Sequence, residues 1–165
     1  MKVLLTGAFG NIGSHVLTEL VRRGHDVRCL ALATPEDRKR ASAFHGIETI
    51  WSHIRDYQTV EAAVAGIDVV VHLAAVIPPA SELDVAGAAK VNVEGTRNVV
   101  TAALAQSGPP KVLFASTFDV HGRTMHRKPP RRVYDPIDPH AVGSTSNFVT
   151  EQVPTVGQQL QQPRW

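Results

Sequence analysis

The 165-residue sequence predicts a single α/β domain in which helices cover both faces of a doubly wound parallel sheet. Two observations lead to this fold class. Short, near-continuous apolar runs alternate with stretches of helical periodicity, and a glycine-rich turn joins the first run to the first helix. The length is that of about one domain, which buries enough surface to fold without disulfides or metals.

The first half of the predicted domain contains three strands and one clear helix. Lys2–Thr6 is a short apolar run that is predicted to form the first strand. Asn11–Arg23 places its apolar residues on one helical face, and Gly24 is a natural end for that helix. Asp26–Leu32 and Gly46–Trp51 are the predicted second and third strands.

The second half of the predicted domain repeats this alternation. Asp56 is suited to cap the next helix. Ile67–Leu73 is the strongest strand signal in the chain, because it is largely apolar and β-branched. A helical region is predicted over Leu83–Ser107, with a break near Gly87, and Lys111–Ala115 is the next strand. The sheet is therefore expected to have at least five strands.

Composition and charge exclude several classes of protein. Hydrophobic residues make up 43% and charged residues 19%, which argues against wholesale disorder. The net charge of +2 is too small to indicate a nucleic-acid or membrane-surface partner. The longest apolar stretch, Val69–Ile77, runs into Pro78-Pro79 and is too short to span a bilayer. With a single cysteine, Cys29, and no signal-peptide pattern, the expected location is the cytoplasm.

A basic stretch, Arg123–Arg132, holds five of the 17 lysine and arginine residues. It lacks interleaved aromatic residues, so an exposed loop is favoured over a nucleic-acid site. A loop that meets an anionic substrate is the intermediate interpretation. Nearby, Asp135, Asp138 and His140 lack the further ligands that a metal site needs, and no metal is expected.

The sharpest motif is a G-x-x-G-x-x-G turn between the first strand and the first helix, with its glycines at Gly7, Gly10 and Gly13. Glycines let the backbone turn tightly and approach a pyrophosphate closely. The helix predicted after the turn has Asn11 and Ile12 in its first turn, where it supplies unpaired N–H groups and the positive end of its dipole. A tight turn that binds nothing is the alternative, and the strand before and the helix after the motif argue against it.

Three further motifs follow in order: His72-Leu73-Ala74-Ala75, Val91–Thr96, and Phe114–Thr117 with Val120–Gly122. With them, residues 1–151 resemble the extended short-chain dehydrogenase/reductases, the NAD(P)-dependent epimerase/dehydratase group. The resemblance implies a Rossmann-like fold and a dinucleotide cofactor. Two motif residues have ordinary alternatives, since His72 is also suited to be a satisfied core histidine and Asn92 a helix-surface amide.

The resemblance also assigns roles to individual residues. It implies that Thr117 hydrogen-bonds the reacting group of the substrate and that Asn92 helps hold the active-site architecture. The segment after the fourth strand lines the ribose and phosphate side of the cofactor. The residues expected at the cofactor are Gly7, Gly10, Asn11, Ile12, Gly13, His53, Ile54, Leu73, Ala74, Ala75, Asn92 and Ser116.

The sequence departs from this family at the proton-transfer pair. The family chemistry uses a tyrosine and a lysine four residues later on one helix face. The segment that should carry them is 139–151, where one alignment gives Gly143 and Asn147 and the next gives Val142 and Ser146. None of these side chains can replace the pair. The expected turnover is therefore marginal, and a non-catalytic dinucleotide-binding module or an inactive fragment is the alternative function.

Two further departures concern the cofactor. Ala31 stands where an acidic residue usually binds the adenosine ribose hydroxyls and selects NAD. Arg38, Lys39 and Arg40 follow closely and are suited to a 2′-phosphate, although a solvated helix face explains a basic run equally well. The expected cofactor is NAD or NADP, with NADP favoured. His53 stands where the family usually has an aspartate that contacts adenine.

The expected organisation is a dinucleotide-binding domain over residues 1–151 and a Gln- and Pro-rich tail over 152–165 that is expected to be disordered. Family members continue further, so the C-terminal substrate region is expected to be missing. The predicted function is that of an epimerase/dehydratase-type oxidoreductase acting on a hydroxyl or carbonyl of a nucleotide sugar or similar small molecule. The resemblance leaves a homodimer open.

Overall fold

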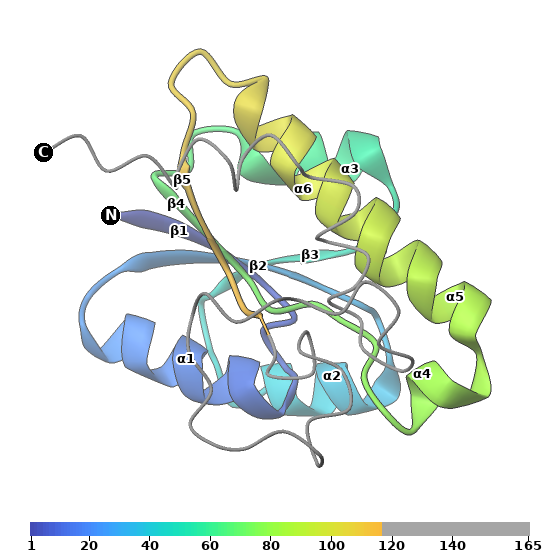
Figure 1. The fold of residues 1–165 in the computed structure, drawn as a ribbon. Helices are drawn as coiled ribbons and strands as arrows, with labels where there is room; N and C mark the ends of the chain where they lie inside the picture. The colour runs from blue at the N-terminus through green and yellow to red at the C-terminus, as the bar shows by residue number, and fades with distance from the viewer. Residues whose placement is uncertain (117–165) are drawn as a thin grey trace, which may run out of the picture. The chain divides into compact units, whose positions relative to one another are not determined.

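The computed structural model describes residues 1–116 of the chain. The chain divides into two compact units. The first unit comprises Met1–Ala75 and Lys90–Ala115, and it contains the whole described sheet (Figure 1). In the second unit the described residues are Val76–Ala89 and Ser116.

The sheet is parallel and has the strand order β3-β2-β1-β4-β5 in the described part of the chain. Its strands are β1 (Lys2–Thr6), β2 (Asp26–Ala31), β3 (Glu48–Trp51), β4 (Val69–His72) and β5 (Lys111–Phe114). This confirms the predicted doubly wound, Rossmann-like α/β class. The chain builds outward from β1 to β3 and then returns to place β4 on the other side of β1. The strand order therefore reverses between β1 and β4, the point at which open α/β sheets bind ligands.

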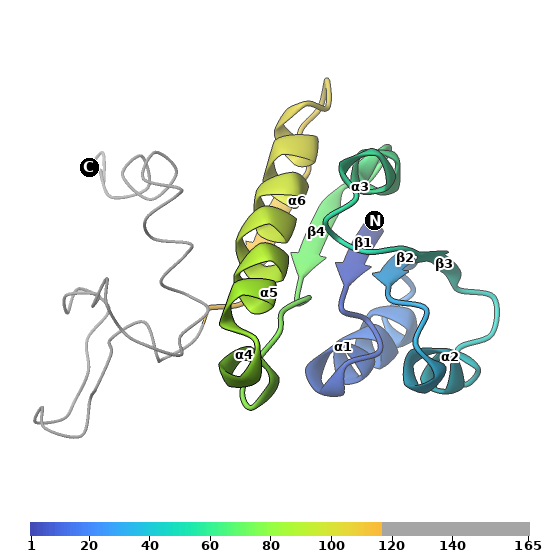
Figure 2. The same ribbon diagram turned by 90° about the vertical axis from the view of Figure 1, so that its right-hand side faces the viewer.

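The helices of the first unit cover both faces of the sheet, with α1 and α2 on one face and α3 and α6 on the other (Figure 2). Their bounds are α1 (Asn11–Arg22), α2 (Pro35–Ala41), α3 (Tyr57–Val64), the π-helical turn η1 (Lys90–Glu94) and α6 (Gly95–Leu104). The second unit contributes the short helices α4 (Ala80–Leu83) and α5 (Val85–Ala89). Among the described residues, no helix is long and apolar enough to cross a membrane.

The helix break predicted near Gly87 occurs three residues earlier, at Asp84, which separates α4 from α5. Gly87 lies inside α5, where its N–H donates to a side-chain oxygen of Asp84 at 2.8 Å. A side chain at Gly87 would collide with that carboxylate, so glycine here permits a cap rather than a break. A second irregularity lies at η1, where the backbone forms a π-helical turn.

Two apolar cores pack against the opposite faces of β1. Leu4 belongs to the core under α3 and α6, whereas its neighbour Leu5 belongs to the core under α1. Alternate residues of a strand point to opposite faces, so one short strand anchors both layers. Cys29 is fully buried in the second core, where burial raises the pKa of its thiol to about 12. It therefore packs as a small apolar side chain and has no nucleophilic role.

Candidate functional site

The turn between β1 and α1 is closed by its own backbone. The N–H of Gly10 donates to the carbonyl oxygen of Gly7 at 3.1 Å, and the N–H of Ser14 donates to that of Gly10 at 3.0 Å. Gly7 has a φ of +68°, a conformation that glycine adopts without strain. The sequence thus forms the predicted glycine turn at the carboxyl end of the central strand.

Two of the glycines are required by packing. A Cβ at Gly7 would lie 2.8 Å from the backbone nitrogen of Ala74 and 2.9 Å from its Cα. A Cβ at Gly13 would collide with the carbonyl oxygen of Gly7 and lie 2.9 Å from the carbonyl group of Ala8. These neighbours are backbone atoms, which cannot rotate away. The turn after β1 and the segment after β4 therefore pack directly against each other at the switch point.

The N-terminus of α1 has unpaired backbone donors. Its N-cap is Gly10, which has no side chain to cap the helix, and the first turn contains no acidic residue. Since the first bond of the helix runs from Ser14 to Gly10, the N–H groups of Asn11, Ile12 and Gly13 have no acceptor within the helix. These donors and the positive end of the helix dipole favour an anion at this position.

A buried chain of hydrogen bonds supports the turn from below. The hydroxyl of Thr6 bonds Nδ1 of His72 at 2.7 Å, and Nε2 of the same ring bonds the hydroxyl of Thr96 at 2.9 Å. Thr96 in turn donates to the carbonyl oxygen of Asn92 at 2.6 Å. The chain joins β1, β4 and the start of α6, three elements that are far apart in the sequence.

The donors in this chain can be assigned from the number of protons. Because Thr96 gives its one hydroxyl proton to Asn92, it must accept from His72, which places the imidazole proton on Nε2. Nδ1 then accepts from Thr6.

The Thr6 oxygen also accepts the N–H groups of Leu73 and Ala74, both at 3.2 Å. Every hydrogen-bonding position of the Thr6 hydroxyl is thus used. Burial lowers the pKa of His72 to about 4, so its ring is neutral at pH 7. His72 is a satisfied core histidine that holds the segment after β4 in place.

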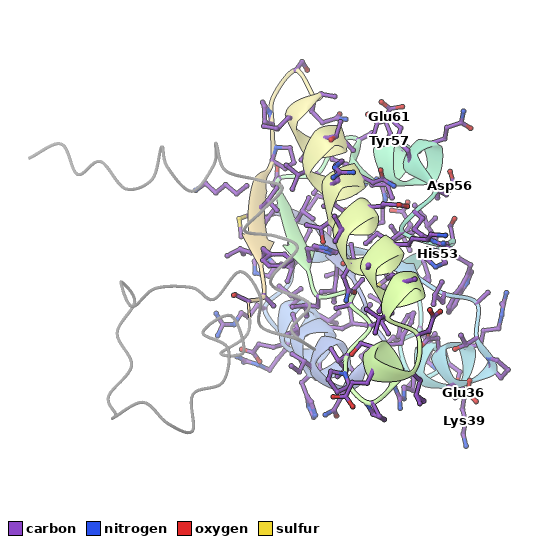
Figure 3. The ribbon with its side chains drawn as sticks, turned by 45° about the vertical axis from the view of Figure 1, so that its right-hand side comes forward. Glu36, Lys39, His53, Asp56, Tyr57 and Glu61 are labelled. Carbon is purple, nitrogen blue, oxygen red and sulfur yellow. The ribbon has the colours of Figure 1, made fainter. Side chains whose placement is uncertain are left out.

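The end of β2 offers no carboxylate, and basic side chains of α2 lie nearby. Ala31, at the end of β2, pairs with Trp51 at the end of β3. The guanidinium of Arg38 lies 4.9 Å from the centroid of the Trp51 ring. Arg40 donates to the carbonyl oxygen of Phe9, within the glycine turn, at 2.6 Å. Lys39, on the same helix, projects away from the sheet (Figure 3).

The segment after β3 is held firmly. Ile54 is buried, and it fits against α6 because a Cβ at Gly95 would lie only 2.5 Å from its side chain. The amide of Asn98 donates to the carbonyl oxygens of Ile54 and Arg55, at 3.2 and 3.0 Å. Preceding Ile54, His53 lies in the connection that leads to Asp56 and α3 (Figure 3).

The structure brings together only part of the predicted set. The three glycines with Asn11 and Ile12 form one turn, and Leu73 and Ala74 lie against it. Ala75 follows them and is exposed, whereas Asn92 is 5% exposed and joins the buried chain, so the helix-surface alternative for it is wrong. His53 and Ile54 lie at the end of β3. The second unit holds Ser116, which is exposed, while Thr117 and residues 139–151 lie outside the described residues.

Sequence reasoning missed several residues of this site. Thr6 and Thr96 were not predicted, because their role depends on partners 66 and 24 residues away in the chain. Helix α2 was expected only as one alternative, a solvated helix face for the basic run Arg38–Arg40, since it has no buried residue and hence no apolar stripe. Its signal was local: the Thr34 hydroxyl accepts from the N–H of Asp37, and proline occupies the first helical position.

Comparison with known proteins places this fold in a family. Residues 4–142 match the 3-beta hydroxysteroid dehydrogenase/isomerase family. The chain belongs to this family. The match, together with nucleotide-sugar enzymes among the relatives, confirms the predicted relationship to the epimerase/dehydratase group. Within residues 1–116, no cluster of three or more His, Cys, Asp or Glu side chains is placed to hold a metal ion.

Individual relatives are similar over most of this chain. A UDP-N-acetyl-alpha-D-glucosaminuronate decarboxylase of Bacillus cytotoxicus is 37% identical over 128 residues, which is 74% of this chain and 38% of that protein. The UDP-glucose 4-epimerase of Thermus thermophilus, solved in complex with NAD, has a TM-score of 0.80 at 28% identity and covers 97% of this chain and 51% of its own.

A short-chain dehydrogenase/reductase superfamily protein from Agrobacterium tumefaciens, solved with bound NAD, has a TM-score of 0.73 at 29% identity. The matched region covers 92% of this chain and 43% of the Agrobacterium tumefaciens protein. The chain thus spans about two fifths to one half of the length of the relatives it matches.

Proposed function

We propose that this chain binds a dinucleotide, NAD or NADP, across the carboxyl edge of its sheet. The observation that carries the proposal is the glycine turn at the switch point, where Gly7 and Gly13 leave no room for a side chain and the α1 N-terminus has unpaired donors. A pyrophosphate is the group whose charge and shape suit this cradle. Relatives solved with NAD support the same interpretation.

The residues of the chain fit the parts of such a cofactor. The N–H groups of Asn11, Ile12 and Gly13 are suited to the pyrophosphate. The segment Leu73–Ala75 is held against the turn by Thr6 and is suited to line the opposite side. When bound, the cofactor supplies hydride transfer at its nicotinamide ring. The protein's contribution here is to hold and orient the dinucleotide.

We further propose an oxidoreductase of the epimerase/dehydratase type that acts on a hydroxyl or carbonyl of a nucleotide sugar in the cytoplasm. The names of two relatives, a UDP-sugar decarboxylase and a UDP-glucose 4-epimerase, support this substrate class. Thr117 is the proposed residue for orienting the reacting oxygen. One observation favours the alternative of a non-catalytic binding module: the segment 139–151 contains neither tyrosine nor lysine.

The first test is calorimetric titration of the purified 165-residue chain with NADH and, separately, with NADPH. We expect micromolar binding of at least one, because the cradle and its donors are formed within the first unit. Circular dichroism serves as the control for folding. A folded chain that binds neither cofactor would overturn the proposal.

A second test separates the enzyme from the binding module. The chain and its double variant Gly143→Tyr/Asn147→Lys are incubated with NAD and UDP-glucose. Absorbance at the NADH wavelength and conversion of the UDP-sugar are both followed, because an epimerase returns the hydride to the sugar and leaves no net NADH; either signal counts as turnover. Turnover by the unaltered chain supports an enzyme. Turnover by the variant alone supports a binding module that has lost its proton-transfer pair, and no turnover by either supports a module without a working substrate site.

The basic side chains of α2 predict which cofactor binds more tightly. We expect NADPH to bind more tightly than NADH, because Arg38 is held over Trp51 at the carboxyl edge and β2 ends in Ala31 rather than a carboxylate. Arg38→Ala should weaken NADPH binding about tenfold and change NADH binding little. Lys39→Ala is the matched control, since it removes the same charge from a side chain that points away. Equal losses for both cofactors, or for both variants, would contradict the assignment.

A further inference from the structure

The order of groups in a dinucleotide determines where its purine base lies. This inference rests on the proposed function, which places the pyrophosphate at the start of α1, beside β1. The adenosine ribose of such a cofactor meets the end of β2. In the sheet order β3-β2-β1, the next strand outward is β3. The base, which lies beyond the ribose, is therefore expected at the end of β3, where Ser52 and His53 follow the strand.

The hydrogen bonds of His53 determine what it can offer to a base. Its Nδ1 accepts from the backbone N–H of Arg55 at 3.1 Å, with the Arg55 Nε–H at 3.4 Å. A nitrogen that accepts carries no proton, so the proton of the neutral ring is on Nε2. Burial and the charge of Arg55 both lower the pKa of His53, which keeps the ring neutral at pH 7. No residue among the described 1–116 bonds Nε2, so His53 offers a single N–H donor.

The carboxylate of the segment 52–56 is engaged at the start of α3. Asp56 is the only acidic side chain of this segment, and each of its oxygens accepts a hydrogen bond at the start of α3. One accepts from the N–H of Thr59 at 3.3 Å and the other from the Thr59 hydroxyl at 2.6 Å. The carbonyl oxygens of Ile54 and Arg55 are likewise occupied by Asn98. Directly after β3, His53 therefore presents an N–H donor on Nε2 to the base edge.

Purines differ at position 6 in whether they donate or accept a hydrogen bond. Adenine carries a 6-amino group, which is a donor, whereas 6-oxopurines such as guanine and hypoxanthine carry an acceptor oxygen there. A carboxylate would pair with the amino group and repel the oxygen. An N–H donor does the reverse, since it pairs with the oxygen and can approach adenine only at a ring nitrogen.

We propose that His53 recognises position 6 of the purine as a hydrogen-bond donor, so that the site binds a 6-oxopurine dinucleotide at least as tightly as the adenine form. The probe is reduced nicotinamide hypoxanthine dinucleotide, which differs from NADH only in its purine: position 6 carries an oxygen in place of the amino group, and N1 carries a proton. Both are titrated calorimetrically into the full chain. We expect the dissociation constant of the hypoxanthine form to equal or lie below that of NADH.

Two substitutions at the same position sharpen the test. His53→Asp replaces the donor with an acceptor and is expected to raise the ratio of the two dissociation constants, hypoxanthine form over NADH, about tenfold. His53→Asn is the control, because asparagine has the shape of the aspartate variant but carries no charge. Its amide can present either a donor or an acceptor, so the ratio of the two dissociation constants should stay near that of the unaltered chain.

The outcomes separate this inference from the function on which it rests. Failure of the folded chain to bind NADH, its hypoxanthine form and NADPH alike would overturn the proposed function. Binding of NADH and its hypoxanthine form, with NADH preferred more than about threefold by the unaltered chain, would overturn the assignment of His53 alone. A ratio of dissociation constants that is unchanged in His53→Asp would also overturn the assignment, because it would show that another group determines the preference between the two purines.

Discussion

Gly7→Ala should lower the free energy of unfolding by about 2–5 kcal/mol and abolish dinucleotide binding. The left-handed conformation at φ +68° costs a residue with a side chain about 1–2 kcal/mol. The new methyl group would also lie 2.8 Å from the backbone of Ala74, and such overpacking costs about 1–3 kcal/mol. Urea unfolding followed by circular dichroism measures the first effect, and titration with NADH and NADPH measures the second.

Gly24→Ala is the matched control for this substitution. Gly24 has nearly the same conformation, with φ +73°, but a Cβ there would meet no atom within 4 Å. Its variant should lose only the conformational cost of about 1–2 kcal/mol and bind the cofactor as before. The difference between the variants isolates the contact with Ala74. Equal destabilisation of the two would show that the segment after β4 yields to the added methyl group.

His72 should make the folded state sensitive to acid. Its pKa is about 4 in the folded state, against an ordinary value of 6.5. Between these values the unfolded chain binds a proton that the folded chain does not, so stability falls as the pH is lowered. The loss begins near pH 6.5, reaches about 3 kcal/mol at pH 4 and makes no difference above neutrality. Urea unfolding at a series of pH values measures it.

His72→Gln tests the cause of this acid sensitivity. The glutamine amide can accept from Thr6 and donate to Thr96, so it is suited to keep the buried chain without titrating. The variant should lose most of the decline between pH 6.5 and 4, while other groups, including His53, keep their smaller shares. His15→Gln, an exposed histidine on α1, is the control and should leave the profile unchanged. A decline that survives in His72→Gln would place its origin elsewhere.

The strands were predictable because their signals are local. Ile67–Leu73 is apolar and β-branched, and its core, Val69–His72, forms β4 as predicted. The glycine turn was predictable for the same reason, since its residues lie within seven positions of one another. The helix α2 was not, because a seven-residue helix with no buried side chain leaves no periodic pattern to detect.

The candidate site was predictable only where its residues are close in sequence. The bond between Thr6 and His72 joins positions 66 residues apart, and no periodicity indicates which distant polar residues will meet. The donor character of His53 likewise depends on a backbone bond from Arg55, which appears only once the loop is folded. Such pairings are properties of the tertiary structure, which brings the elements together.

The tight packing of the glycine turn has a consequence for how cofactor preference could evolve. Gly7 and Gly13 lie against backbone atoms, so a side chain at either position destabilises the fold and removes the binding together. Arg38 lies on a helix that buries no residue, so mutations there leave both cores intact. Lineages can therefore drift between cofactors through neutral changes on α2, while purifying selection holds the turn constant.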